Sequence, residues 1–235
     1  MNTSNQNGSW LSSLESGGVD LQSIMRQVYV WMGFGMLVTA GMAYFTVSTP
    51  LLKLASNPII LLVAVLAEFG LVMGISLGFN RISASTATLL FLAYAALNGF
   101  TLSMVLLAFT LGSVLAAFVS TAALFGAMSV LGYTTKVDLS KMGTFLMMGV
   151  IGILIASVVN MFISSGPLDF LISAAGVLIF TGLTAYDTQR IGRMAAQRGM
   201  DAEAAAKFGI FGALKLYLDF INMFLFMLRL FGRRR

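Results

Sequence analysis

The chain of 235 residues is 58% hydrophobic and only 10% charged, with a mean hydropathy of +0.92. An average soluble domain carries roughly 25% charged residues, so this composition excludes an ordinary water-soluble fold and predicts an integral membrane protein. The net charge of +5 comes from basic residues at the ends of apolar runs, which is the pattern of membrane orientation signals and argues against a nucleic-acid partner.

The chain begins with a polar segment, residues 1–26, in which Ser, Asn and Gly are scattered. This segment lacks the basic start, short apolar core and small-residue cleavage site of a secretory signal. We expect residues 1–26 to form a disordered cytoplasmic tail and residues 27–235 to form a single transmembrane domain.

Apolar runs close to the roughly 20 residues that a membrane-spanning helix needs fill the rest of the chain. The seven runs are Val28–Val47, Ile59–Phe79, Thr86–Phe109, Ser113–Tyr133, Gly143–Ile163, Leu168–Tyr186 and a last one ending near Phe231. All are predicted as helices, because an apolar span must satisfy its own backbone hydrogen bonds. The fold class is therefore all-α, a polytopic membrane protein. The longest polar connector, Asp187–Lys207, contains a capped helix start at Asp201.

The second span carries Gly70, Gly74 and Gly78, which form overlapping Gly-xxx-Gly steps. Such steps let a neighbouring helix approach closely. Because successive residues of a helix are about 100° apart, Glu68 lies on the opposite side from Gly70. We expect this helix to pack through its glycines and to present a carboxylate on another face.

The distribution of Lys and Arg predicts the orientation. Eight basic residues fall on the side of the N-terminus and four on the other side. The eight are Arg26, Arg81, Lys136, Lys141, Arg190, Arg193, Arg198 and Lys207, and the four are Lys53, Arg233, Arg234 and Arg235. An excess of Lys and Arg marks the cytoplasmic side, so we expect a cytoplasmic N-terminus.

The arginines at the C-terminus conflict with a simple seventh crossing. If Lys215 lies at the cytoplasmic surface, the apolar part of the last helix, Leu216–Phe231, is about 24 Å long. The hydrocarbon core of a bilayer is about 30 Å thick. The last helix therefore either spans a thinned section of the membrane or re-enters on the same side, and the sequence leaves the side of the C-terminus open.

The chain contains no Cys and no His. This removes thiolate nucleophiles, disulfides, Ser-His-Asp catalysis and ordinary zinc sites, and we expect no cofactor. Any proton response near neutral pH has to come from carboxylates.

Ionisable residues inside a membrane span are costly, and each one is a functional candidate. The candidates are Glu68 in the second span, Asp187 at the end of the sixth, Asp219 in the seventh, and Arg81 just after the second. We interpret Asp169 as a helix-start residue and Asp138 as a solvated loop charge.

Asp187 and Asp219 are predicted to meet, because the sixth span reaches the cytoplasmic side at Asp187 and the seventh starts from that side. Two carboxylates at similar depth on neighbouring helices would share a proton. In the alternative interpretation, Asp219 pairs with Lys215 at i and i+4 while Asp187 caps a helix end.

Three segments, taken together and in this order, resemble one protein family. They are Gly132–Ser140 (GYTTKVDLS), Thr184–Gln189 (TAYDTQ) and Leu216–Asn222 (LYLDFIN). From Leu21 to its C-terminus the chain resembles the bacterial branch of the transmembrane Bax inhibitor motif (Bax inhibitor-1) family, which suggests a bacterial inner membrane.

The resemblance implies a seven-helix bundle in which the other six helices wrap the last one, and a pH-sensitive calcium leak through the bilayer. It implies that Asp187 and Asp219 form the proton sensor, that Arg81 latches this pair, and that Glu68 matches a glutamate of the family's second helix. The aspartates would hold calcium, the transported ion, only transiently, because calcium prefers oxygen ligands.

Two other classes of function are compatible with the sequence. Intramembrane aspartyl proteases also use paired aspartates and share the Tyr186–Asp187 dipeptide, but they carry glycines where this chain has Leu216 and Leu218. We therefore expect no enzymatic activity. The alternative to a leak is an interaction protein that regulates a membrane protease or quality-control complex, with the polar N-terminal tail as the recognised end.

Overall fold

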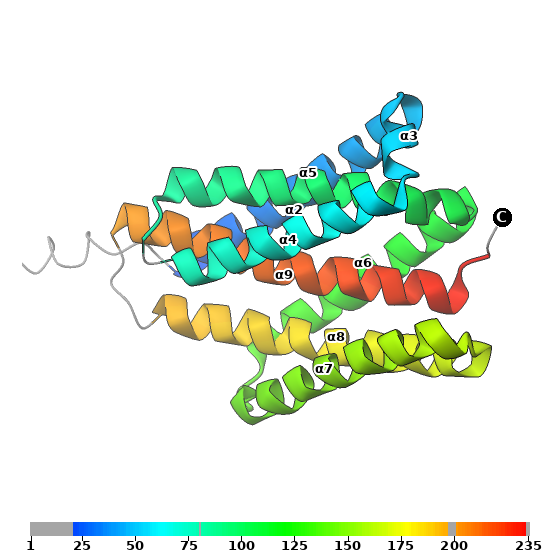
Figure 1. The fold of residues 1–235 in the computed structure, drawn as a ribbon. Helices are drawn as coiled ribbons and strands as arrows, with labels where there is room; N and C mark the ends of the chain where they lie inside the picture. The colour runs from blue at the N-terminus through cyan, green and yellow to red at the C-terminus, as the bar shows by residue number, and fades with distance from the viewer. Residues whose placement is uncertain (1–20, 80, 197–200, 234–235) are drawn as a thin grey trace, which may run out of the picture.

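The computed structural model describes residues 21–79, 81–196 and 201–233. Within these ranges the chain forms α2 (Leu21–Ser48), α3 (Leu51–Ala55), α4 (Pro58–Gly78), α5 (Ala84–Ala108), α6 (Leu111–Thr134), α7 (Ser140–Ile163), α8 (Gly166–Ala196) and α9 (Ala202–Phe231). Seven of these helices, all except α3, are long and apolar enough to cross a membrane (Figure 1). The all-α fold class and the seven spans are therefore confirmed.

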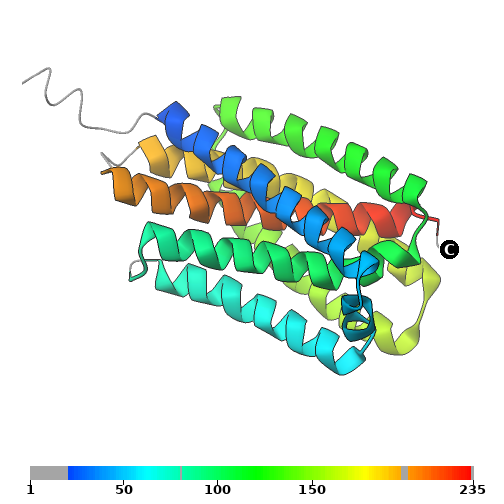
Figure 2. The ribbon, with the colours of Figure 1, turned by 90° about the horizontal axis from the view of Figure 1, so that it is seen from above.

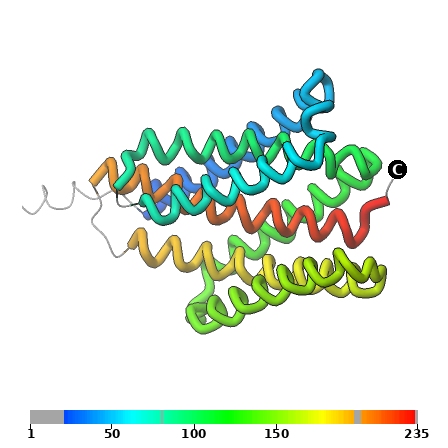
Figure 3. Tube along the Cα trace, viewed as in Figure 1, coloured from blue at the N-terminus to red at the C-terminus, as the bar shows by residue number. Residues whose placement is uncertain are grey.

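Consecutive spans run in opposite directions, so their ends collect at two faces (Figures 1 and 3). We call the face that holds the start of α2, the α4–α5 turn and the start of α9 the N-face, and the opposite one the C-face. Residues 1–20 of the expected tail lie outside the described residues, and from Leu21 on the chain is already helical.

Helix α9 lies at the centre of the bundle, as the family resemblance implied. Of the residues in its most apolar window, 67% are buried, the highest share among the spans. Its main contacts are with α8, α2, α6 and α5 (Figure 2). The outer helices α4 and α7 pack mainly against α5 and α8. The central helix is thus held chiefly by four neighbours, not equally by all six.

Helix α9 crosses the whole bundle. Its 30 residues correspond to about 45 Å at 1.5 Å per residue, and it ends at the C-face (Figure 1). There the backbone of Arg233 joins the α5–α6 connection: its N–H donates to Ser113 Oγ (2.9 Å) and its carbonyl accepts from the Thr110 N–H (3.1 Å). The re-entrant alternative for the last helix is therefore wrong.

Local capping sets several helix starts. The Asp201 carboxylate accepts from the Ala204 N–H at 2.7 Å, which confirms the predicted start of the last helix. Asn57 caps α4 in the same way (2.9 Å to the Ile59 N–H), with Pro58 in the first turn. Asp169 lies in the first turn of α8, where its charge complements the helix dipole.

The glycines predicted to pack α4 against a neighbouring helix do not do so among the described residues. A Cβ atom added at Gly70 or Gly74 would meet nothing within 4 Å, and one at Gly78 would contact only Ile82 of the following turn, at 3.4 Å. The close approaches lie elsewhere: a Cβ at Gly132 would overlap the backbone of Ala185, and one at Gly143 would overlap the ring of Tyr186. These contacts bring α6 and α7 onto α8. Gly132, Ala185 and Tyr186 belong to two of the segments that carry the family resemblance, so these segments contain residues at which the helices pack closely.

Candidate functional site

The two aspartates singled out by the sequence lie on α8 and α9, the most extensively packed pair of helices among the described elements. Asp187 is 5% exposed and Asp219 is 4% exposed. Asp187 does not end its helix, because α8 continues to Ala196. The polar stretch after Tyr186 stays helical because one of its faces is buried, with Thr188, Gln189 and Ile191 turned inward.

Lys215 supplies the positive charge next to the pair. Its ammonium donates to Asp187 Oδ1 at 3.4 Å, from α9 to α8. Its field attracts both carboxylates, and the two carboxylates repel each other, so the three groups form one electrostatic unit. Arg190 of α8 adds a weaker attraction at Asp187. The alternative of an i, i+4 ion pair between Lys215 and Asp219 is not what the structure contains.

Asp219 is the less satisfied member of this unit. Its Oδ2 atom is buried and has no hydrogen-bond partner among the described residues. A buried carboxylate oxygen without a donor is costly. A proton bound to this carboxylate, or a cation in contact with it, would lower that cost. The arrangement therefore favours the binding of a positive charge at Asp219.

Arg81, expected as a latch on the aspartates, lies in the exposed turn between α4 and α5. Within the described ranges, no hydrogen bond or ion pair joins it to Asp187 or Asp219. Lys207 holds this turn instead: its ammonium donates to the Ile82 carbonyl at 3.0 Å. The cation in contact with the pair is Lys215, which lies one helical turn before Asp219.

Glu68 lies about halfway along α4 and belongs to a second polar site. Its Oε1 accepts from the Thr101 hydroxyl at 2.7 Å, and its Oε2 accepts from the Asn98 amide at 3.3 Å. The Tyr217 hydroxyl donates to Asn98 Oδ1 at 3.0 Å and lies 2.6 Å from the Thr39 hydroxyl. A chain of hydrogen bonds therefore crosses α4, α5, α9 and α2.

A lateral cavity adjoins this chain. Its volume is about 350 Å³, and it lies between α4 and α5 on one side and α7, α8 and α9 on the other. Glu68, Tyr94, Asn98 and Asn222 are the polar residues of an otherwise apolar lining. The cavity brings a carboxylate at mid-membrane depth next to the central helix. Sequence reasoning singled out Glu68 by its charge but missed Asn98, Tyr217 and Thr39, which are uncharged.

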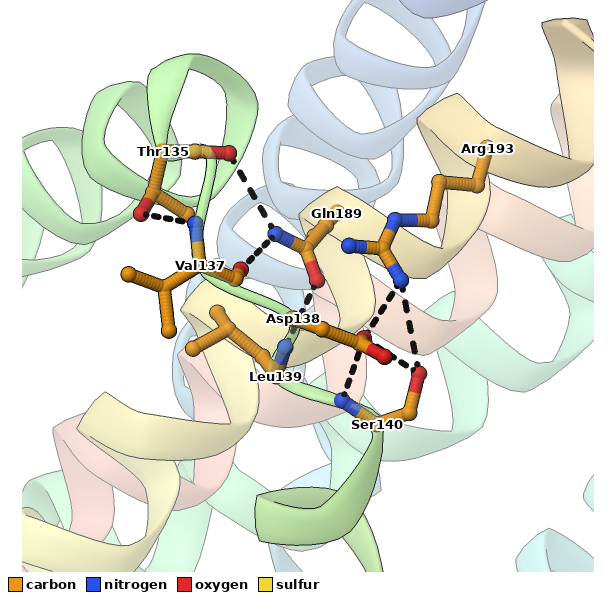
Figure 4. A network of polar contacts seen from close by, with 7 residues as sticks. All are labelled: Thr135, Val137, Asp138, Leu139, Ser140, Gln189 and Arg193. Carbon is orange, nitrogen blue, oxygen red and sulfur yellow. Dashed lines mark hydrogen bonds and ion pairs between the residues drawn. The ribbon is translucent and has the colours of Figure 1, made fainter.

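A third polar cluster fixes α8 at the N-face (Figure 4). Gln189 accepts from the Leu139 N–H (2.9 Å) and donates to the Val137 carbonyl (2.8 Å), so one side chain holds the α6–α7 loop on α8. Arg193 forms an ion pair with Asp138 of the same loop. We call these contacts of Gln189 and Arg193 with the α6–α7 loop the loop clamp. Along α8 the loop clamp begins two residues beyond Asp187.

Asp138 is solvated as expected, but it is not isolated. Its side chain is 63% exposed. Hydrogen bonds from the Ser140 side chain and backbone and from Arg193 lower its pKa from 3.8 to about 2. Asp138 therefore stays ionised at any pH near neutrality.

No group of three or more His, Cys, Asp or Glu gathers within the part of the chain that the structure describes. The aspartate pair offers carboxylate oxygens but not the six to eight ligands of a tight calcium site.

Fold and site together define a polytopic helical membrane protein with buried or half-buried carboxylates at two separate places along its central helix. The comparisons with known proteins agree with this class. The model of the family described as "Inhibitor of apoptosis-promoting Bax1" matches residues 21–235. The chain belongs to this family, the Bax inhibitor-1 family.

Several bacterial proteins are similar over nearly their whole length. Inner membrane protein YbhL of Escherichia coli is 44% identical over 218 residues, which are 92% of this chain and 93% of that protein. A protein of Borreliella burgdorferi is 48% identical over 213 residues, 90% of this chain and 92% of its own. A membrane protein of Streptococcus pyogenes is 37% identical over 219 residues, 92% and 94% of the two chains. The chain is thus an integral protein of a bacterial inner membrane.

Proposed function

We propose that this protein is a pH-sensitive leak for calcium or a similar cation, with Asp187 and Asp219 as the proton sensor. The observation that carries the proposal is the buried unit of two carboxylates and one ammonium on adjacent helices inside the bundle. Lys215 contacts only Asp187, and Arg190, one turn further along α8, adds a weaker attraction at that same carboxylate. The buried Oδ2 atom of Asp219 has no hydrogen-bond partner among the described residues, so the two aspartates are unequally compensated.

The proposed switch follows from that imbalance. With both carboxylates ionised, Asp187 is held by Lys215, while the repelled Asp219 keeps a free oxygen. A proton on either aspartate removes one of the two negative charges, and with it the repulsion between the carboxylates of α8 and α9. Two arrangements of the same helices, one for each protonation state, could then differ in how easily a cation passes.

Glu68 is the proposed second contact of the permeating ion. A carboxylate at mid-membrane depth beside a cavity of about 350 Å³ offers a resting place between the two faces. Its partners Thr101 and Asn98 are neutral donors, so its charge is not compensated by any described Lys or Arg. Conduction requires sites that bind a cation weakly and release it.

Calcium flux into liposomes that hold the purified protein, followed against pH, tests the proposal. The wild type should show a flux that changes with pH, and Asp187→Asn and Asp219→Asn should each remove most of that change. Asp169→Asn is the matched control, because it removes the same charge from the opposite end of α8. A wild-type protein that passes no cation at any pH would leave the regulation of a membrane protease complex as the better proposal.

A further inference from the structure

A groove separates α2 and α6 at the N-face, away from the aspartates. Both helices pack against α9 but not closely against each other, and they lie on the same side of the bundle (Figure 2). The groove has a volume of about 460 Å³. Its lining includes Met25, Arg26 and Tyr29 of α2 and Gly126, Ser129 and Tyr133 of α6.

The groove extends from the membrane surface into the bilayer. Its α2 residues belong to the first turns of that helix, and its α6 residues belong to the last turns. At 1.5 Å per residue the lining covers a depth of about 10 Å. This is the zone of lipid headgroups and the first part of their acyl chains, where tyrosines are enriched in membrane proteins.

Two polar groups of the groove, those of Arg26 and Ser129, have no partner among the described residues. Arg26 is exposed, and among the described residues no carboxylate pairs with it. Ser129 is 6% exposed, and its hydroxyl has no hydrogen-bond partner within the described ranges. Deeper in the groove the lining is mostly apolar, and a Cβ at Gly126 would meet nothing within 4 Å.

We infer that this groove binds one anionic phospholipid of the leaflet at the N-face. The Arg26 guanidinium would contact the phosphate in the forked geometry that suits it, and the tyrosine hydroxyls would reach the same headgroup. An acyl chain would run over Met25 and the space beside Gly126. An anionic lipid matches this depth, this opening to the bilayer and a positive charge that no described carboxylate compensates.

Lipid retention tests the inference without reference to ion flux, so it is independent of the proposed leak. The protein is reconstituted with equal amounts of phosphatidylglycerol and phosphatidylcholine, extracted in mild detergent, and examined by native mass spectrometry. The wild type should keep one phosphatidylglycerol in preference to phosphatidylcholine. Arg26→Gln should lower this retention by about fivefold, as expected for one basic residue at the membrane surface.

Two matched pairs of variants separate the groove from general effects. Lys141→Gln removes a positive charge from the same face outside the groove and should retain lipid like the wild type. Gly126→Leu fills the groove and should abolish retention, whereas Gly152→Leu adds the same side chain at another open glycine, on α7, and should not. Unfolding temperatures in detergent verify that each variant is folded. Equal retention of both lipids by the wild type, or unchanged retention in Arg26→Gln, would overturn the inference.

Discussion

At the scale of single residues, the chemistry of this protein depends on a few charges inside the bilayer. Asp187, Lys215 and Asp219 lie within one electrostatic unit, and Glu68 lies in another. The three acidic residues could be predicted from the sequence, because ionisable residues are rare inside apolar runs. The residues that contact them could not be predicted in this way. Which cation approaches Asp187 depends on how helices are placed in space, and Lys215 takes the place expected for Arg81.

The first prediction concerns additivity within the aspartate pair. If one proton is shared, Asp187→Asn and Asp219→Asn should each remove most of the pH dependence of the cation flux. The double variant should add little, because members of one coupled unit are not additive. Flux assays in liposomes over a series of pH values measure this. Wild-type pH profiles in both single variants would leave the aspartates with a structural role only.

The second prediction concerns Lys215. Lys215→Met leaves Asp187 buried without its cation, and we expect the free energy of unfolding to fall by about 2 kcal/mol. A fully buried pair would lose more, but the Lys215 side chain is 30% exposed. Chemical unfolding in detergent measures the loss. Arg81→Gln is the control: this exposed side chain should change stability by less than about 0.5 kcal/mol. A larger loss of unfolding free energy in Arg81→Gln than in Lys215→Met would mean that Arg81, not Lys215, holds the aspartate pair.

The third prediction concerns the pH behaviour of the loop clamp. The folded pKa of Asp138 lies below its ordinary value, so its contribution to stability is present above pH 3.8 and is lost as the pH falls towards 2. Between about pH 5 and pH 8 it contributes no pH dependence. Asp138→Asn should therefore keep the pH profile of the flux. A flattened profile would mean that the loop clamp itself takes part in sensing.

At the scale of helices, hydropathy predicted the number of spans and most of their ends. It missed the last part of α8, because the residues after Tyr186 are polar and lower the mean hydropathy of any window. They remain helical because Gln189 and Arg193 bond to the α6–α7 loop. Hydropathy also could not predict which glycines lie close to another helix. Glycines in one apolar helix look alike in sequence, although Gly132 touches another backbone and Gly74 touches nothing.

The fourth prediction uses this contrast between glycines. A Cβ at Gly132 would overlap the backbone of Ala185, which cannot turn away as a side chain can. We expect Gly132→Ala to lower the free energy of unfolding by about 1–3 kcal/mol. Gly74→Ala should change it by less than about 0.5 kcal/mol, since the added methyl group meets nothing within 4 Å. Unfolding in detergent compares the two variants directly. Equal effects would mean that α6 and α8 are not closely packed at this point.

At the scale of the whole molecule, the start of α2 and the end of α9 lie at opposite faces (Figure 1), and the count of basic residues predicts which face is cytoplasmic. The N-face holds the larger share of Lys and Arg and is expected to be cytoplasmic.

The fifth prediction tests this orientation. A single Cys placed at Ser83, in the exposed α4–α5 turn, should react only with reagents that reach the cytoplasm. A single Cys at Ser164, in the α7–α8 connection, should react from outside. The chain has no native Cys, so each label reports one position. The reverse pattern would invert the topology without changing the fold.

The central position of α9 has a consequence for biosynthesis. The ribosome makes this helix after the other six spans, so those spans enter the membrane before the element around which they pack. Until then the Asn98 side-chain oxygen lacks the Tyr217 hydroxyl, and the Asp187 carboxylate lacks the Lys215 ammonium, that contact them in the finished protein. Thr39 already has partners, because its hydroxyl donates to backbone carbonyls of α2 and α5. We expect a nascent chain released before α9 to keep a carboxylate in the bilayer without its cation, which would make it a substrate for membrane quality control.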